Sequence, residues 1–230
     1  MQTQLAPQTE APNAPATPET LAGPTWHELR RSLGDSHRAR GAFQCAAVGR
    51  ANINRLIESL TSASRRFVGR MHVEMPFEPL ASTVWRGELV VTAQALVRNP
   101  LLASLAPGVH TGPVPGALAV FDGVYCLMEG LHTPQGHPTA WISHDPGIAG
   151  LAQTTWQRVK AQSRPAEQPM LTERQVQVAA QLVLGETTRV IARHLGYSER
   201  TVERDVEVVT LFVGANSRTA AIARLLGAVH

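Results

Sequence analysis

Residues 191–202 read IARHLGYSERTV, and this stretch decides the fold of the C-terminal part of the chain. Gly196 can take the left-handed backbone conformation in which helices often end. Ser198 follows two residues later and belongs to the residue types preferred at a helix N-cap. The residues after it that repeat at the spacing of one buried helical face are Val202, Val206, Val209 and Val213. The sequence therefore predicts two helices joined by a tight turn.

Helix signals of the same kind lie on both sides of this stretch. Thr172 opens a capping box, which is a typical start of a helix, and Gly185 can end that helix. Either Thr187 or Thr188 can cap the short helix that leads to Gly196. The segment 217–229 repeats the apolar spacing. We therefore expect an all-α C-terminal domain of four helices.

The third of these helices carries two arginines on its predicted outer face. Each helical residue turns by about 100°, so Arg200 and Arg204 lie one turn apart and nearly opposite the valines. A helix held by short neighbours, with paired guanidinium groups in its exposed N-terminal half, has the geometry needed to enter a major groove. The alternative is a helix that only packs, with both arginines in solvent beside Glu203 and Glu207.

The order of these signals resembles the LuxR-type helix-turn-helix of bacterial transcription regulators. The residues that carry the resemblance are LTER at 171–174, Gly185, the stretch 191–202 and SR at 217–218. The resemblance implies a module whose third helix reads DNA and whose fourth helix commonly dimerises. Carried over residue by residue, it implies DNA contacts from Arg189, Ser198, Arg200, Thr201, Arg204 and Arg218.

Three residues depart from the usual pattern of that family. Gln175 stands where the family generally has Glu, and Glu203 and Asp205 stand where basic residues or His are common. Residues 171–230 hold seven arginines and no lysine against five glutamates and one aspartate, a net charge of +1. Because phosphate contacts supply much of DNA affinity, we expect modest affinity per monomer. A module that has lost DNA binding and instead binds another protein is the alternative.

The residues before this module predict a mixed α/β (α+β) domain. An amphipathic helix is expected at 52–67, and Asp145 can cap a second helix that has Pro146 in its first turn. Asp122 and Gly123 form a two-residue hairpin signal between two apolar runs. The strands expected from alternation and β-branched content are 69–75, 88–93, 117–121, 124–128 and 139–143.

Residues 113–130 and 139–160 resemble a degenerate phospholipase D-like domain. The active family needs the motif HxKxxxxD, in which His attacks phosphorus and Lys holds the phosphate. Aligning Asp122 with the last position places Pro115 and Ala117 where His and Lys belong, so we predict no catalytic residue and regard an active phosphodiesterase as improbable. Asp122 has an equally good role as the first residue of the hairpin turn.

Composition divides the chain and limits its function. The expected segments are a disordered tail at 1–23, the α/β sensor or dimerisation domain at 24–160, a linker at 161–170 and the helix-turn-helix domain at 171–230. No apolar stretch is long enough to span a bilayer and no secretion signal is evident, so we expect a cytoplasmic, nucleoid-associated protein. Cys45 and Cys126 fit reduced, packed thiols.

These observations predict a homodimeric transcription regulator that binds double-stranded DNA. The formal charge of +3 permits an anionic partner without requiring one. We expect no cofactor, no membrane contact and no metal site, because the spacing of His132, His137, His144 and Asp145 matches no known metal site. A small molecule or a protein could be the effector, and the sequence does not choose between them.

Overall fold

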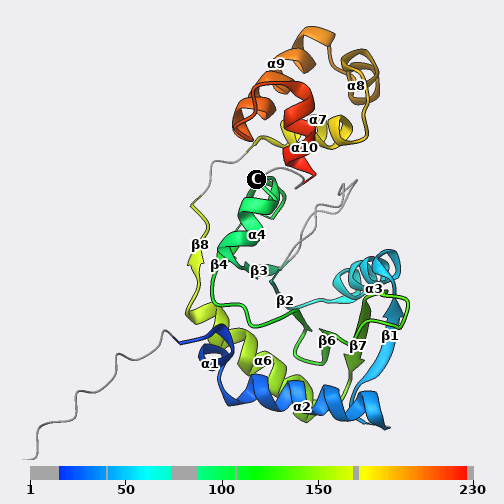
Figure 1. Ribbon diagram of the computed structural model, residues 1–230, viewed down its shortest axis with the longest axis vertical. Coiled ribbons are helices and arrows are strands. Elements are labelled where there is room, and N and C mark those ends of the chain that lie inside the picture. The colour runs from blue at the N-terminus through cyan, green and yellow to red at the C-terminus, as the bar shows by residue number, and fades with distance from the viewer. Residues whose placement is uncertain (1–15, 40, 74–86, 107, 168–170, 227–230) are drawn as a thin grey trace, which may run out of the picture.

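The computed structural model describes residues 16–39, 41–73, 87–106, 108–167 and 171–226. Its strands are β1 (Gln44–Val48), β2 (Val68–His72), β3 (Glu88–Val91), β4 (His110–Thr111), β5 (Leu118–Phe121), β6 (Tyr125–Glu129), β7 (Thr139–Ser143) and β8 (Arg164–Pro165). Its helices are α1 (Pro18–Ala22), α2 (Pro24–Arg38), α3 (Arg50–Ala63), α4 (Ala93–Arg98), α5 (Leu102–Leu105), α6 (Pro146–Ala161), α7 (Glu173–Val183), α8 (Thr188–Leu195), α9 (Glu199–Phe212) and α10 (Arg218–Leu225). A mixed α/β region followed by a helical region confirms the expected fold class (Figure 1).

All of these strands belong to one sheet, in the order β1-β7-β6-β5-β2-β3-β4-β8. Neighbouring strands are antiparallel, except that β2 and β3 and likewise β3 and β4 run parallel. The hairpin between β5 and β6 turns at Asp122 and Gly123, whose φ angles of 54° and 71° are both left-handed. The loop is one residue longer than the two-residue turn that the sequence predicts, because Phe121 pairs with Tyr125 and Val124 also lies between the strand ends.

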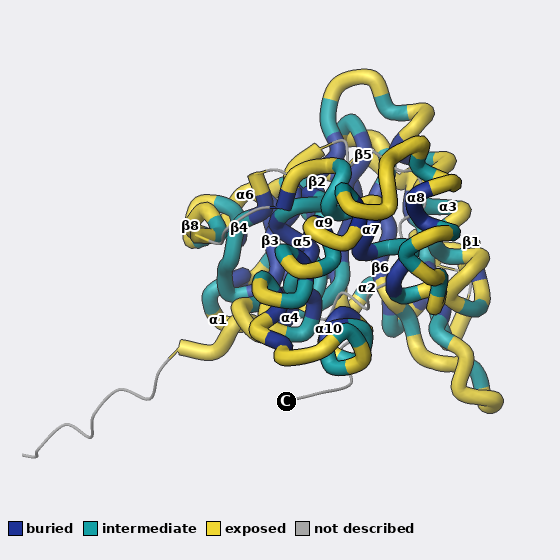
Figure 2. Tube along the Cα trace, turned by 90° about the horizontal axis from the view of Figure 1, so that it is seen from above, coloured by how far each residue is buried: buried dark blue, intermediate teal, exposed yellow. Residues whose placement is uncertain are grey.

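Helices cover both faces of the sheet. On one face α2 and α6 pack with strand residues in a core that contains Trp26, Val120 and Met128. On the other face α3 lies over β1 and β7, and α4 and α5 lie over β3. Because side chains alternate along a strand, the central strands contribute to both cores, and β5 is buried along its whole length (Figure 2).

The four C-terminal helices share one core and rest on the α/β region. Val178, Leu182 and Ile191 are part of this core, and Leu101 from the α/β region, which is 1% exposed, belongs to it too. The backbone N–H of Leu171 donates to Ser104 Oγ at 2.9 Å, where α5 contacts α7. The helix-turn-helix region is therefore held against α5 on its α7 side.

Several expected segments differ from the structure at their ends. The helix expected at 52–67 runs over Arg50–Ala63, and Phe67 instead packs against the Trp156 ring next to β2. The strand expected at 69–75 is β2 over Val68–His72, with residues 74 and 75 outside the described residues. The strand expected at 88–93 ends at Val91 because the hydroxyl of Thr92 caps α4.

The tail and the linker are more ordered than the composition suggested. Within the tail expected at 1–23, Thr17 caps α1 and Ala22 is fully buried, so residues 16–23 are structured, whereas residues 1–15 lie outside the described residues. Within the linker expected at 161–170, β8 pairs with β4. Backbone pairing at a sheet edge requires no apolar side chains, which explains why composition missed this strand.

The two cysteines occupy different environments. Cys126 is buried in β6, and burial raises the pKa of its thiol to about 12, so it is the packed thiol that was expected. Cys45 is exposed on β1, which corrects the expectation for that residue, because β1 is an edge strand with one covered face. In the described part of the chain, no helix is long and apolar enough to cross a bilayer.

Candidate nucleic-acid interface

Capping residues at the ends of α8 and α9 determine the turn between these two helices. The Thr187 hydroxyl accepts the N–H of Val190 at the start of α8, which settles the choice between Thr187 and Thr188. Gly196 ends α8 with φ at 75°, and the Ser198 hydroxyl accepts the N–H of Thr201 at 3.1 Å to begin α9. These local contacts fix the direction in which α9 leaves the turn.

α9 has one buried face and one exposed face. Val202 and Val209 are fully buried in the core of the C-terminal domain, and Val213 is also buried, as the valine spacing predicts. Arg200 and Arg204 are exposed. The two guanidinium groups therefore lie on solvent-facing positions, and the contact with α5 is made by another part of the domain.

The remaining predicted contact residues lie around this helix, but they differ in how many of their polar groups are already hydrogen-bonded within the protein. Arg189 is exposed on α8. The Ser198 and Thr201 hydroxyls are 2.8 Å apart, and both take part in the cap of α9. The Arg218 guanidinium donates to Thr188 Oγ1 and to a backbone carbonyl of the α7–α8 turn. Arg218 therefore fastens α10 to the start of α8 and has fewer N–H groups left for a phosphate.

Asp205 lies inside the fold, although its sequence position suggested an acid facing DNA. Its side chain is 2% exposed and accepts two hydrogen bonds from Arg174, at 2.6 Å from Nε and 3.1 Å from NH2. The same guanidinium lies 5.5 Å from the centre of the Tyr197 ring. Hydrogen bonding and the charge of Asp205 raise the pKa of Arg174. Asp205 therefore joins α7 to α9, and of the two acids that depart from the family pattern only Glu203 is exposed, as are Glu199 and Glu207 on the same helix.

Sequence reasoning missed three residues of this region. Arg174 was read only as part of the LTER pattern, and its partner is 31 residues away along the chain. Arg193 and His194 lie exposed in the last turn of α8, next to the turn that leads to α9. Their position before Gly196 is a signal that could have found them, because basic side chains beside a recognition helix are placed to reach phosphates.

In the α/β region, the side chain of Asp122 is hydrogen-bonded to the backbone of a neighbouring segment. Its carboxylate accepts the backbone N–H groups of Arg65, Arg66 and Phe67 at 2.9, 2.8 and 2.7 Å. These bonds lower its pKa. Pro115 and Ala117 precede it in the sequence and supply no nucleophile or cation. The observed contacts of Asp122 close the hairpin against the residues that enter β2.

The histidine-rich segment contains no metal-binding cluster among the described residues. His132 lies 3.6 Å from a Glu129 carboxylate oxygen, and the His144 ring packs edge-on against Tyr125. No group of three or more His, Cys, Asp or Glu side chains in the described ranges is arranged to hold a metal ion.

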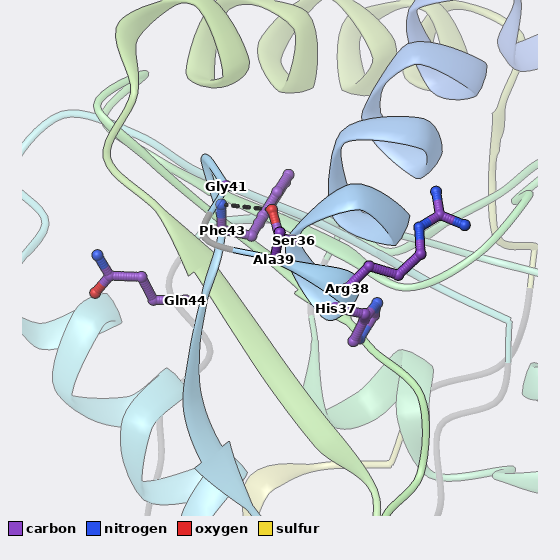
Figure 3. A pocket seen from close by; sticks show the side chains of 7 residues that line it. All are labelled: Ser36, His37, Arg38, Ala39, Gly41, Phe43 and Gln44. Carbon is purple, nitrogen blue, oxygen red and sulfur yellow. Dashed lines mark hydrogen bonds between the residues drawn. The ribbon is translucent and has the colours of Figure 1, made fainter.

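An open hollow of about 660 Å³ lies between the end of α2 and β1 (Figure 3). Three of its polar side chains already have partners: Ser36 Oγ accepts the N–H of Phe43, His37 accepts the N–H of Leu131, and Arg38 pairs with Asp35. The hollow therefore offers few unsatisfied groups for recognising an effector.

Comparison with known proteins identifies the C-terminal domain. Residues 169–225 match the family of bacterial regulatory proteins called the luxR family (GerE). A search of curated protein sequences finds no match. Among solved structures, the chain is similar to Nuc, a phospholipase D family member from Salmonella typhimurium, with 15% identity, a TM-score of 0.40 and coverage of 54% of this chain and 97% of that one.

A second similar structure is NucT from Helicobacter pylori, with 12% identity, a TM-score of 0.37 and coverage of 54% of this chain and 99% of that one. The capped turn, the buried valine face of α9 and the sequence match agree on the C-terminal module. Residues 169–225 are a helix-turn-helix domain of the luxR family of bacterial regulatory proteins.

Proposed function

We propose that this protein is a sequence-specific transcription regulator that binds double-stranded DNA with α9 in the major groove. The observation that carries the proposal is the exposure of Arg200 and Arg204 on α9, opposite a face on which Val202 and Val209 are fully buried. Guanidinium groups pair well with guanine edges and phosphates. The docking contact with α5 involves Leu101 and Leu171, and both arginines stay exposed in its presence.

We assign the DNA contacts in two groups. Arg200 and Arg204 are the proposed base-reading residues, because they project from the N-terminal half of α9. Arg189, Ser198, Thr201 and Arg218 are the proposed phosphate contacts and positioning residues, with Arg218 limited by the hydrogen bonds that it already makes. The burial of Asp205 weakens the alternative of a module that binds protein in place of DNA, since that alternative depended on two exposed acids.

We propose that residues 24–160 are a non-catalytic domain for dimerisation or signal reception. Pro115 and Ala117 support the lack of phosphodiesterase chemistry, because neither side chain can attack phosphorus or hold its charge. Leu101 of this domain is buried among the helix-turn-helix residues. A conformational change in the α/β domain could therefore act on the DNA-binding module through this direct contact. Light scattering on the purified chain is expected to give about twice the mass of the 24.8 kDa monomer, and a monomer at all concentrations would refute the dimer.

The DNA-binding proposal is tested with a duplex recovered by selection from a random-sequence library. Fluorescence anisotropy should show that Arg200→Gln and Arg204→Gln each lower affinity by about 5- to 150-fold, the value of about 1–3 kcal/mol expected for a bidentate base contact. Arg31→Gln on α2 is the control, because Arg31 is exposed and far from α9 in sequence. Equal affinity and equal salt dependence in all three variants would show that α9 is not the recognition helix.

A further inference from the structure

The positive charge of this protein is concentrated outside the helix-turn-helix domain. Residues 50–70 contain five arginines and one glutamate, a net charge of +4, which exceeds the formal charge of +3 of the whole chain. Residues 171–230 have a net charge of only +1. Affinity for a polyanion depends on the number of cations that reach it. The α/β region therefore carries a cationic surface that the proposed recognition helix does not use.

Four of these arginines are exposed on α3 and on the turn that follows it. We call this set the α3 basic surface, and it consists of Arg50, Arg55, Arg65 and Arg66. The inner face of α3, with Ile53, Leu56 and Ile57, packs against the sheet, so Arg55 lies on the outer side of the helix. Arg70, in β2, is partly buried and is not part of this surface.

Carboxylates do not neutralise the α3 basic surface as they do the arginines of α2. On α2, Arg31 and Arg38 pair with Glu28 and Asp35 at 3.8 and 2.7 Å. Among the described residues, none of the four arginines of the α3 basic surface makes an ion pair within 4.0 Å. Apart from the electrostatic interaction of Arg66 with Asp122, the surface therefore keeps its charge for an external partner.

The acids nearest to this surface are engaged within the fold. Glu58 is on α3 and has an interaction of its own, and the Asp122 carboxylate is held by three backbone N–H groups.

Two contacts hold parts of the surface in place. The Asp122 carboxylate binds the backbone N–H groups of Arg65 and Arg66, which fixes the turn from which both side chains project. Asn52 accepts a hydrogen bond from Arg55 at 2.6 Å while its amide donates to Val48 O. At 1.5 Å per helical residue, Arg50 and Arg55 are about 7.5 Å apart along α3, the axial length of about two base pairs, and Arg65 and Arg66 follow beyond the end of that helix at Ala63. Such spacing suits contacts with several phosphates.

The α3 basic surface is on the same side of the molecule as α8. Figure 1 shows α8 above α3 at the right of the molecule, and Figure 2, viewed from above, shows the two helices again on the right and close to one another in projection. A duplex that contacts α8 and continues along this side of the molecule would reach α3. We infer that the α3 basic surface is a second, sequence-independent contact for the DNA backbone, an inference that rests on the proposed DNA binding.

The test uses the full chain and a random-sequence duplex of about 40 base pairs, because a backbone contact needs no operator. The triple variant Arg55→Gln, Arg65→Gln, Arg66→Gln is compared with the triple variant Arg30→Gln, Arg31→Gln, Arg38→Gln on α2, which removes the same charge. The slope of log affinity against log salt should fall in magnitude by about 2 to 3 in the α3 triple, since each phosphate contact contributes about 0.9. The α2 triple should change it by less than about 1.

The outcomes separate this inference from the proposed function. If both triples change the slope equally, while Arg200→Gln and Arg204→Gln still abolish selection of a preferred sequence, the inference is wrong and the function stands. If the unsubstituted chain binds no duplex even at low salt, the proposed function fails and the inference fails with it. If the α3 triple loses only binding to phosphatidylglycerol vesicles and keeps its DNA slope, the surface contacts a membrane and the inference is overturned.

Discussion

Asp205 and Asp122 are two carboxylates that the structure holds in different ways. Asp205 is almost completely buried and shares two hydrogen bonds with one guanidinium group, that of Arg174. Asp122 lies in a surface hairpin and accepts three successive backbone N–H groups. One joins two helices through a side-chain pair, and the other joins a hairpin to a neighbouring strand through the backbone. In both cases, the hydrogen-bond donors that surround the carboxylate determine which two parts of the fold it joins.

This difference explains which parts of the molecule could be predicted from the sequence. The helix-turn-helix was predictable because its signals are local: the hydroxyls of Thr172 and Ser198 cap helices within three residues, and Gly185 and Gly196 end helices with left-handed backbone. The same holds for the hairpin at Asp122. Each of these features depends on residues that are neighbours in the chain.

Features that depend on distant residues were not predictable. Asp205 was expected to oppose phosphate, because nothing near it in sequence indicates Arg174 as its partner. Strand β1 was missed since its residues are small and largely exposed, and the strand forms by pairing with β7 about 90 residues later. The docking of Leu101 in the helix-turn-helix core was missed for the same reason. Of the candidate site, the exposed arginines of α9 followed from helical spacing alone.

The largest expected effect is that of Arg174→Met. This change leaves the Asp205 carboxylate, which is 2% exposed, without a partner for its charge. A buried carboxylate in that state costs about 2–3 kcal/mol of unfolding free energy. Urea denaturation followed by circular dichroism at pH 7 measures the loss.

The double variant Arg174→Met, Asp205→Leu is the matched control for this prediction. It removes the unpaired charge and should recover most of the stability, because a buried ion pair and an apolar pair of similar volume have similar free energies. If the double variant is as unstable as the sum of its two single variants, the Arg174–Asp205 contact is not the cause of the loss.

A smaller, pH-dependent effect is expected for Asp122→Asn. Asn is chosen because residue 122 has φ at 54°, a conformation that Asn tolerates well. The backbone N–H groups hold the pKa of Asp122 below its ordinary value of 3.8, so its contribution is complete above that pH and is lost as the pH falls through the lower folded-state pKa. The unsubstituted protein should therefore be the more stable at pH 7, and its advantage should shrink below about pH 4.

Thermal unfolding of both proteins between pH 3 and pH 7 measures this difference. Glu207→Gln on α9 is the control, because Glu207 is exposed and makes no ion pair within 4.0 Å among the described residues. A stability difference for Asp122→Asn that stays constant, or that grows as the pH falls, would contradict the assignment of the three hydrogen bonds to the ionised carboxylate.

The smallest expected effect distinguishes two of the acids of α9, Glu203 and Asp205, in DNA binding. Glu203 is exposed beside Arg204, so Glu203→Gln removes a negative charge that faces the proposed phosphates and should raise affinity for a random-sequence duplex by about two- to fivefold at low salt. Asp205→Asn removes the same charge from a buried position next to Arg174 and should leave that affinity within about twofold, provided that the variant is folded at the assay temperature. Fluorescence anisotropy at two salt concentrations distinguishes the two variants, because the gain from Glu203→Gln should fall as salt screens the exposed charge. An equal gain from both would show that burial and pairing do not remove Asp205 from the electrostatics of the DNA-facing surface.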